Sequence, residues 1–230
     1  MSRVVDKRNT RKLKVKLLVP VFTIVTIFIV YMLIPVKTSE YTETDSIYDI
    51  TKGLSLPYVE IEGISIKKQF DSSSCGITTV TVISNFYNKT EYEPIELFEK
   101  YNSRGNTDLI ELLRRELPEK EVLYKSNVSD IDMIEDIHSS LMKENPVVVF
   151  FGAPNPYNEP YYDLHGSVVY GIDIMSDRIL IANAYGYSEE ITLAEFMNRM
   201  SYSVRQRYTF AQRFVWKFIK IEKNMYVIID

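Results

Sequence analysis

Residues 17–36, LLVPVFTIVTIFIVYMLIPV, form a run without a single charged side chain. An α-helix rises about 1.5 Å per residue, so a run of this length can cross a hydrocarbon layer of roughly 30 Å. Pro20 and Pro35 lie near its two ends, where proline disturbs a helix least. A cleaved signal peptide would have a shorter apolar core and a small-residue cleavage site, which this sequence lacks. We therefore expect residues 17–36 to be a transmembrane helix.

The charges around this run predict its orientation. Residues 1–16 carry seven Lys or Arg side chains, whereas acidic residues follow the run from Glu40 onward. Because cytoplasmic flanks are enriched in Lys and Arg, we expect residues 1–16 to be a cytoplasmic basic tail and the main part of the chain to be extracytoplasmic, anchored in the cell membrane by this single pass. Residues 1–37 have a net charge of +7, and since the whole chain has −4, residues 38–230 carry −11. An acidic body argues against nucleic acid as a partner.

The rest of the chain divides into a linker and one folded domain. Residues 37–55 are polar and acidic with no helical apolar stripe, so we interpret them as a linker, followed by a domain at residues 56–230. The hydrophobic periodicity predicts an α+β fold in which a helical half precedes a strand-rich half. Helices are expected within 75–88, 93–102, 106–117, 129–145 and 192–200, and extended runs within 57–70, 121–126, 146–151, 165–173, 178–186 and 225–230. No assignment is made for residues 201–223.

Cys75 is the only cysteine of the chain and begins the apolar run CGITTVTVISNFYN. The three serines before it, at 72–74, are natural helix N-caps, so the cysteine is expected at the start of a buried helix. Unpaired N–H groups at a helix N-terminus stabilise a thiolate. Cys75 is therefore a candidate nucleophile, with Gly76 allowing close backbone packing beside it. The alternative is a small, buried and inert side chain, since a lone cysteine cannot form an internal disulfide.

A nucleophilic cysteine needs a base, and the chain has only two histidines. His138 lies within an amphipathic helical pattern, where a histidine is usually a surface or packing residue. His165 is expected at the start of a strand, directly after the polar loop APNPYNEPYYDL. We therefore favour His165 as the general base.

The base in turn needs a residue that orients it. Asp173 is too distant, because eight residues of one strand span about 26 Å at about 3.3 Å each. Residues 165–172 and 178–183 are expected to form an antiparallel hairpin, which places His165 opposite residues 183–185. Asn183 is the polar side chain at that position, although an asparagine there could simply cap a turn. Gln69, six residues before Cys75, could join the cysteine N–H in an oxyanion hole, or be an ordinary surface residue.

The order Gln69, Cys75, His165 and Asn183 resembles the papain-like cysteine peptidase superfamily, in particular its bacterial C39-like branch. The matching stretches lie within residues 64–200 and are QFDSSSCGITTVTVISNFY, NPVVVFFG, HGSVVYGID, ILIANAYG and ITLAEFMNRM. This resemblance implies a papain-like fold, with Cys75 as nucleophile, His165 as base and acid, Asn183 as orienting residue and Gln69 as oxyanion donor. The chain departs from the branch in having Asn-Ala where Asp-Pro is frequent, and isoleucine in place of tyrosine before Asp173.

The resemblance implies a membrane-anchored thiol peptidase that acts on a peptide or protein through an acyl-enzyme. No cofactor is expected, since one cysteine and two distant histidines make no zinc set. Two alternatives remain open. The same residues could transfer the acyl group to another amine, as a transpeptidase or amidase on cell-wall or peptide substrates, or the domain could be an inactive peptide binder. The oligomeric state stays undetermined.

Overall fold

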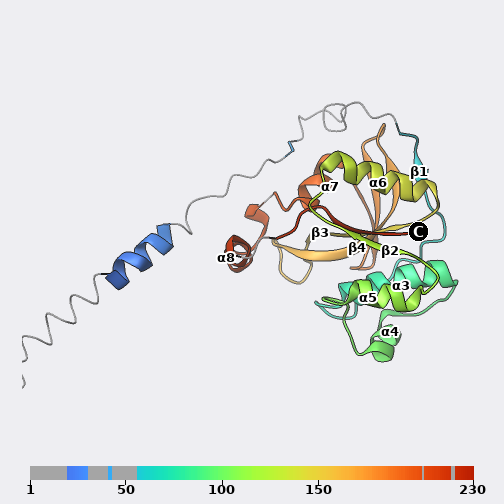
Figure 1. The fold of residues 1–230 in the computed structure, drawn as a ribbon, viewed down its shortest axis with the longest axis horizontal. Coiled ribbons are helices and arrows are strands. Elements are labelled where there is room, and N and C mark those ends of the chain that lie inside the picture. The colour runs from blue at the N-terminus through green and yellow to red at the C-terminus, as the bar shows by residue number, and fades with distance from the viewer. Residues whose placement is uncertain (1–19, 31–40, 43–55, 204, 219–220) are drawn as a thin grey trace, which may run out of the picture. The chain divides into compact units, whose positions relative to one another are not determined.

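The computed structural model describes residues 20–30, 41–42, 56–203, 205–218 and 221–230 (Figure 1). The chain separates into two compact units, Met1–Thr38 and Ser39–Asp230. In the first unit residues 20–30 are helical, and their apolar side chains are largely exposed. The other residues of the expected transmembrane run, the basic tail and most of the linker lie outside the described residues. Within the described ranges, no helix is both long and apolar enough to cross a membrane.

The second unit is built on one antiparallel sheet in the order β2-β7-β3-β4-β5-β6, with β1 paired to β4. The strands are β1 (Val59–Glu60), β2 (Val122–Lys125), β3 (Val147–Pro154), β4 (Tyr162–Asp173), β5 (Arg178–Asn183), β6 (Tyr187–Ile191) and β7 (Met225–Ile229). The helices are α3 (Cys75–Asn88), α4 (Pro94–Tyr101), α5 (Leu109–Glu116), α6 (Asp130–Met142), α7 (Leu193–Met200) and α8 (Phe210–Phe218), with a short 3₁₀ helix at Arg205–Arg207.

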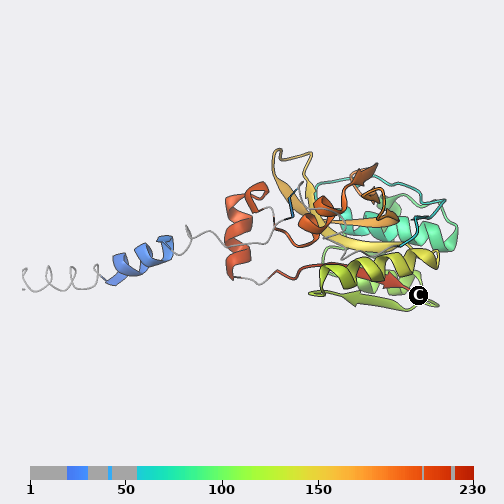
Figure 2. The same ribbon diagram turned by 90° about the horizontal axis from the view of Figure 1, so that it is seen from above.

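Helices cover both faces of this sheet, as Figures 1 and 2 show. The central strand β3 explains why. Val147, Val149 and Phe151 pack in one core with α6 and α7, whereas Val148 and Phe150 face a second core formed with α3, α4 and α5. Because side chains of a strand alternate between its two faces, an uninterrupted apolar run such as VVVFF requires both faces to be covered.

The expected helices and most of the expected strands are confirmed, and the helices lie on both faces of the sheet. Helices α3, α4 and α5 form a layer on one face of the sheet, and α6 and α7 cover the opposite face. The alternating residues 57–70 contribute only the short β1, and the edge strand β6 was not foreseen. The unassigned residues 201–223 contain the 3₁₀ helix and α8. The overall class, mixed helix and antiparallel sheet, stands.

Candidate active site

Cys75 is the first residue of α3, as its sequence predicts. Ser74 occupies the N-cap position, as expected, but its side chain makes no capping hydrogen bond. Its hydroxyl instead accepts the backbone N–H groups of Phe70 and Asp71, both at 3.1 Å. These bonds stabilise the turn that leads into the helix, so the N–H groups at the start of α3 are not covered by a serine side chain.

The backbone beside Cys75 packs directly against another backbone segment. The N–H of Ile77 donates to the carbonyl of Arg104 at 2.7 Å. A Cβ on Gly76 would lie 2.4 Å from the carbonyl oxygen of Gly105, so no larger residue fits there without a shift. This contact holds the start of α3 against the 103–105 segment and confirms the close packing expected at Gly76.

Cys75 and His165 line the same cavity, which has a volume of about 340 Å³. The helix side contributes Cys75, and β4 contributes Asp163 and His165, two positions on one face of the strand. The remaining wall includes Tyr185 and, from α8, Gln212. Gly166 allows β4 to lie close to α3, because a Cβ at this position would lie 3.2 Å from the hydroxyl of Thr79 on α3.

His165 is oriented by Asn183, and the hairpin expected from the sequence brings the two together. β4 and β5 pair with Ser167 opposite Asn183. Nε2 of His165 lies 2.9 Å from Oδ1 of Asn183. One expectation needs correction, because His165 does not begin its strand: β4 starts at Tyr162, where it continues the pairing with β3.

The neighbours of Asn183 determine which ring nitrogen of His165 carries the proton. The backbone N–H of Tyr185 donates to Oδ1 of Asn183 at 3.0 Å, so the atom at that position must be the amide oxygen. An amide oxygen only accepts, and therefore Nε2 of His165 is the donor. Nδ1 is left as the unprotonated nitrogen, which is the form that can accept a proton from a thiol.

Burial shifts both candidate catalytic groups toward their neutral forms. His165 is 2% exposed and stacks on the ring of Tyr185, with ring centroids 4.0 Å apart. This burial lowers the pKa of His165 to about 4, although its bond with Asn183 acts in the opposite direction. Burial likewise raises the pKa of Cys75, and the backbone N–H groups of Gly166 and Gly76 offset only part of that effect. The start of α3 therefore does not by itself hold a resting thiolate.

Gln69 is not brought into the cavity. Its side chain is 3% exposed, and its amide nitrogen donates to the carbonyl of Asp71 at 2.8 Å. Its backbone N–H donates to Ala184 at 2.7 Å, which holds the segment against the chain following β5. The amide oxygen is buried with no hydrogen-bond partner among the described residues. An oxyanion role for Gln69 stays a prediction.

Asp163, Tyr185 and Gln212 are among the cavity residues that were not predicted from the sequence. Asp163 could have been found from its spacing, because it lies two positions before His165 on the same strand. Tyr185 gave a weak signal as the aromatic residue that follows the asparagine strand. Nothing in the local pattern indicates Gln212, which donates to Asp163 and to the carbonyl of Tyr162 from a segment far along the chain.

His138 lies on α6, on the other side of the sheet, and its Nε2 is 2.9 Å from the carbonyl of Pro57. It is a packing residue, as its helical position suggests. Over the described parts of the chain, no three His, Cys, Asp or Glu side chains come together as a metal site requires.

Comparison with known proteins gives one family. The model of the Peptidase_C39 like family matches residues 61–210. Among solved structures, the chain is similar to a putative C39-like peptidase from Bacillus anthracis, at 12% identity and a TM-score of 0.45, over 76% of this chain and 98% of that one. It is also similar to the peptidase domain of Streptococcus ComA, a bi-functional ABC transporter involved in a quorum sensing pathway, at 14% identity and a TM-score of 0.45, over 73% and 98% of the two chains. No curated protein matches. Because the family match extends over more than half of its length, the protein belongs to the Peptidase_C39 like family.

Proposed function

We propose that the protein is a cysteine peptidase that cleaves peptide bonds with Cys75 as nucleophile and His165 as base. One observation carries the proposal: a buried histidine, held by an asparagine at 2.9 Å, lines the same cavity as the single cysteine at the start of a helix. Nucleophile, base and orienting residue are the parts that acyl transfer through a thioester needs. Membership of a peptidase family supports a peptide or protein as substrate.

The reaction proceeds in two halves. Nδ1 of His165 takes the thiol proton as the sulfur attacks the scissile carbonyl carbon, and the carbonyl oxygen becomes an oxyanion. The protonated imidazole gives that proton to the leaving nitrogen, the C–N bond breaks, and an acyl-thioester remains on Cys75. Nδ1 then takes a proton from water while the hydroxide attacks the thioester. Return of the proton to sulfur releases the carboxylic acid product and restores the thiol.

The neutral resting state decides how the base is used. Since burial raises the pKa of Cys75 and lowers that of His165, proton transfer accompanies attack on the substrate rather than preceding it. The backbone N–H groups of Cys75 and Gly76 at the start of α3 are the proposed first donors for the oxyanion. Gln69 is the proposed second donor, through the amide hydrogen that Asp71 does not take.

The same proposal places the domain outside the cell membrane, anchored by residues 17–36 with the N-terminus in the cytoplasm. Its support is the uncharged run itself, the basic residues before it and the exposed apolar side chains of helix 20–30. Protease added to intact cells should then remove the domain while a tag on the N-terminus stays protected. Protection of the whole chain would contradict this arrangement.

The test of peptide cleavage uses a mixture of synthetic decapeptides incubated with the full-length chain in H₂¹⁸O and analysed by mass spectrometry. Hydrolysis introduces ¹⁸O at a new carboxyl terminus, whereas acyl transfer to added glycinamide produces a ligated mass. Cys75→Ala and His165→Gln should both abolish product, and His138→Gln, which removes the other histidine, should not. Product that persists in Cys75→Ala would refute the mechanism. Peptide binding without any product would support the inactive binder instead.

A further inference from the structure

The side of Asn183 that faces away from His165 meets the largely buried carboxylate of Glu189. Nδ2 of Asn183 donates to Oε2 of Glu189 at 2.7 Å, and the asparagine has no exposed surface. The contact crosses from β5 to β6, where Asn183 pairs with Tyr187 and Glu189 lies two positions further on the same face. The amide of Asn183 is therefore held from both ends: its oxygen faces the imidazole and its nitrogen faces the carboxylate.

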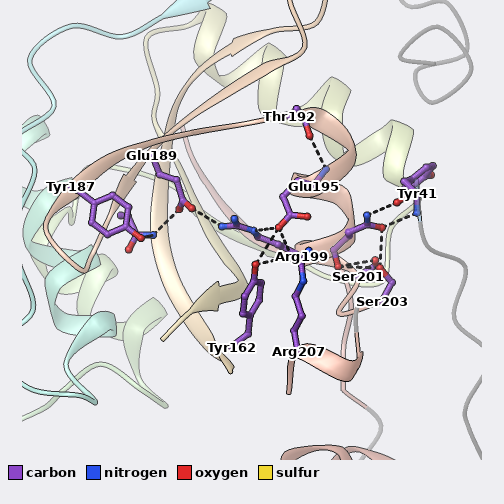
Figure 3. A network of polar contacts seen from close by, with 12 residues as sticks. Tyr41, Tyr162, Tyr187, Glu189, Thr192, Glu195, Arg199, Ser201, Ser203 and Arg207 are labelled. Atoms are coloured by element: carbon purple, nitrogen blue, oxygen red, sulfur yellow. Dashed lines mark hydrogen bonds and ion pairs between the residues drawn. The ribbon is translucent and has the colours of Figure 1, made fainter. Parts of the chain in front are cut away.

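The carboxylate of Glu189 is itself fixed by an ion-pair network (Figure 3). Its other oxygen accepts Nη1 of Arg199 at 2.7 Å, and the two side chains are 11% and 7% exposed. Arg199 also donates through Nε to Glu195 at 2.9 Å, and Glu195 accepts Nη1 of Arg207 at 2.7 Å. Two carboxylates and two guanidinium groups thus alternate in one chain of contacts that leads from Asn183 toward α8.

The ion pairs favour the charged forms of Arg199 and Glu195. Burial by itself would lower the pKa of Arg199, but Glu189 and Glu195 outweigh that effect and raise it. Burial would likewise raise the pKa of Glu195, yet Arg199 and Arg207 lower it. Both oxygens of Glu189 accept, one from Arg199 Nη1 and one from Asn183 Nδ2, and so this side chain imposes one orientation on the amide of Asn183.

We infer that Glu189, held by Arg199, is a positioning residue that fixes the Asn183 amide and thereby the Nε2–H tautomer of His165. This inference rests on the proposed function for its catalytic consequence, because only that tautomer leaves Nδ1 free to take the thiol proton. The tautomer itself exists, and can be measured, without any substrate. Glu189 touches neither substrate nor cysteine in this role, and it acts through Asn183 alone.

Glu189→Gln is the substitution that isolates the effect. A glutamine whose oxygen accepts from Arg199 directs its NH₂ group at Nδ2 of Asn183, so two donors face each other. Turning the Asn183 amide relieves this conflict at the cost of the hydrogen bond from the Tyr185 N–H, and it directs an N–H at Nε2 of His165. Nε2 must then accept, and the ring proton moves to Nδ1. The carboxylate variant Glu189→Asp retains an acceptor for the amide and should recover the original form.

The measurement is the two-bond ¹H–¹⁵N correlation spectrum of the full-length chain labelled with ¹⁵N-histidine. The spectrum is simple to assign, since the chain has two histidines and His138→Gln removes the signals of one. We expect His165 in the wild type to show a protonated Nε2 and an unprotonated Nδ1, and Glu189→Gln to populate the Nδ1–H form. Glu190→Gln is the matched control: the neighbouring side chain on β6 is 57% exposed, and its ion pair among the described residues is the one with Arg178 at 3.9 Å.

A wild-type spectrum with the proton on Nδ1, or a Glu189→Gln spectrum identical to that of the wild type, would overturn the inference. Should Glu189→Gln fail to fold, Glu189→Leu replaces it: loss of the acceptor for Nδ2 leaves the Asn183 amide free to turn, so the Nδ1–H form should appear, and a spectrum identical to that of the wild type would overturn the inference. Where peptide cleavage is measurable, its rate should fall in proportion to the lost Nε2–H fraction, about tenfold if one molecule in ten keeps it. Absence of cleavage in every variant would refute the peptidase proposal and leave the tautomer result standing.

Discussion

Replacing Gly105 by alanine should destabilise the second unit strongly. Gly105 has a φ of +73°, and a Cβ there would lie 2.7 Å from the backbone carbon of Gly76 and from the nitrogen of Ile77. The left-handed backbone costs alanine about 1–2 kcal/mol, and forced overpacking adds about 1–3 kcal/mol. Both obstructing atoms belong to the backbone of α3 and cannot turn away as a side chain can. We therefore expect a total loss of about 2–5 kcal/mol.

Gly63→Ala is the matched control. Gly63 has a φ of +80°, but nothing lies within 4 Å of the position that its Cβ would occupy. It should lose only the backbone contribution of about 1–2 kcal/mol. Urea unfolding of both variants measures the two free energies, and each kcal/mol corresponds to about 2–4 °C in Tm for a unit of this size. Equal destabilisation by the two substitutions would refute the steric argument. Gly105→Ala should also change the alkylation rate of Cys75, because the 104–105 backbone holds the residues that follow it in α3.

The other predictions concern pH, charge and the docking of α8. Because the pKa of His165 is about 4, the folded protein binds this proton less readily than the unfolded chain does. The contribution of His165 to the unfolding free energy is therefore complete above pH 6.5 and is lost, by about 3 kcal/mol, as the pH falls to 4. Urea unfolding of His165→Gln should show a decrease over this pH range that is smaller by about 3 kcal/mol, and an equal decrease in both proteins would contradict the prediction. Asp163 lines the cavity and makes no ion pair within the described residues, so Asp163→Asn should lower the ratio of cysteine alkylation by bromoethylamine to that by iodoacetate by about tenfold, and an unchanged ratio would exclude a cation-selective cavity. A Cβ at Gly152 would lie 1.8 Å from the hydroxyl oxygen of Tyr208, which packs against the single tryptophan. Gly152→Ala should therefore displace Tyr208 and shift the tryptophan emission to longer wavelength. Unchanged emission would contradict a displacement of the tryptophan.

Local sequence patterns were sufficient for the elements that carry the central pair. The apolar run after three serines gave the bounds of α3, and with them the place of Cys75 at the helix start. The short connection between the two strands predicted that the side chains of His165 and Asn183 meet, because the register of an antiparallel hairpin follows from its turn. Both inferences use residues that are close along the chain, where spacing translates directly into distance.

The strand β6 escaped prediction because it is an exposed edge strand, with charged residues that carry little strand signal. The same strand supplies Glu189, whose partner Arg199 belongs to a separate helix. The role of Gln69 stays a prediction: its spacing from Cys75 suggested an oxyanion donor, and in the structure its amide donates one hydrogen bond to the carbonyl of Asp71.

The amino-acid sequence by itself determined which elements form, where the single cysteine lies and which histidine faces an asparagine, since these depend on periodicity and on a short hairpin. Tertiary structure alone decided the protonation of the site: burial depresses the pKa of His165 to about 4, and the contacts of Asn183 select the tautomer of that histidine. Desolvation and hydrogen-bond direction depend on every group that surrounds an atom. Those groups come from β4, β5, β6, α3 and α7, which only the folded chain brings together.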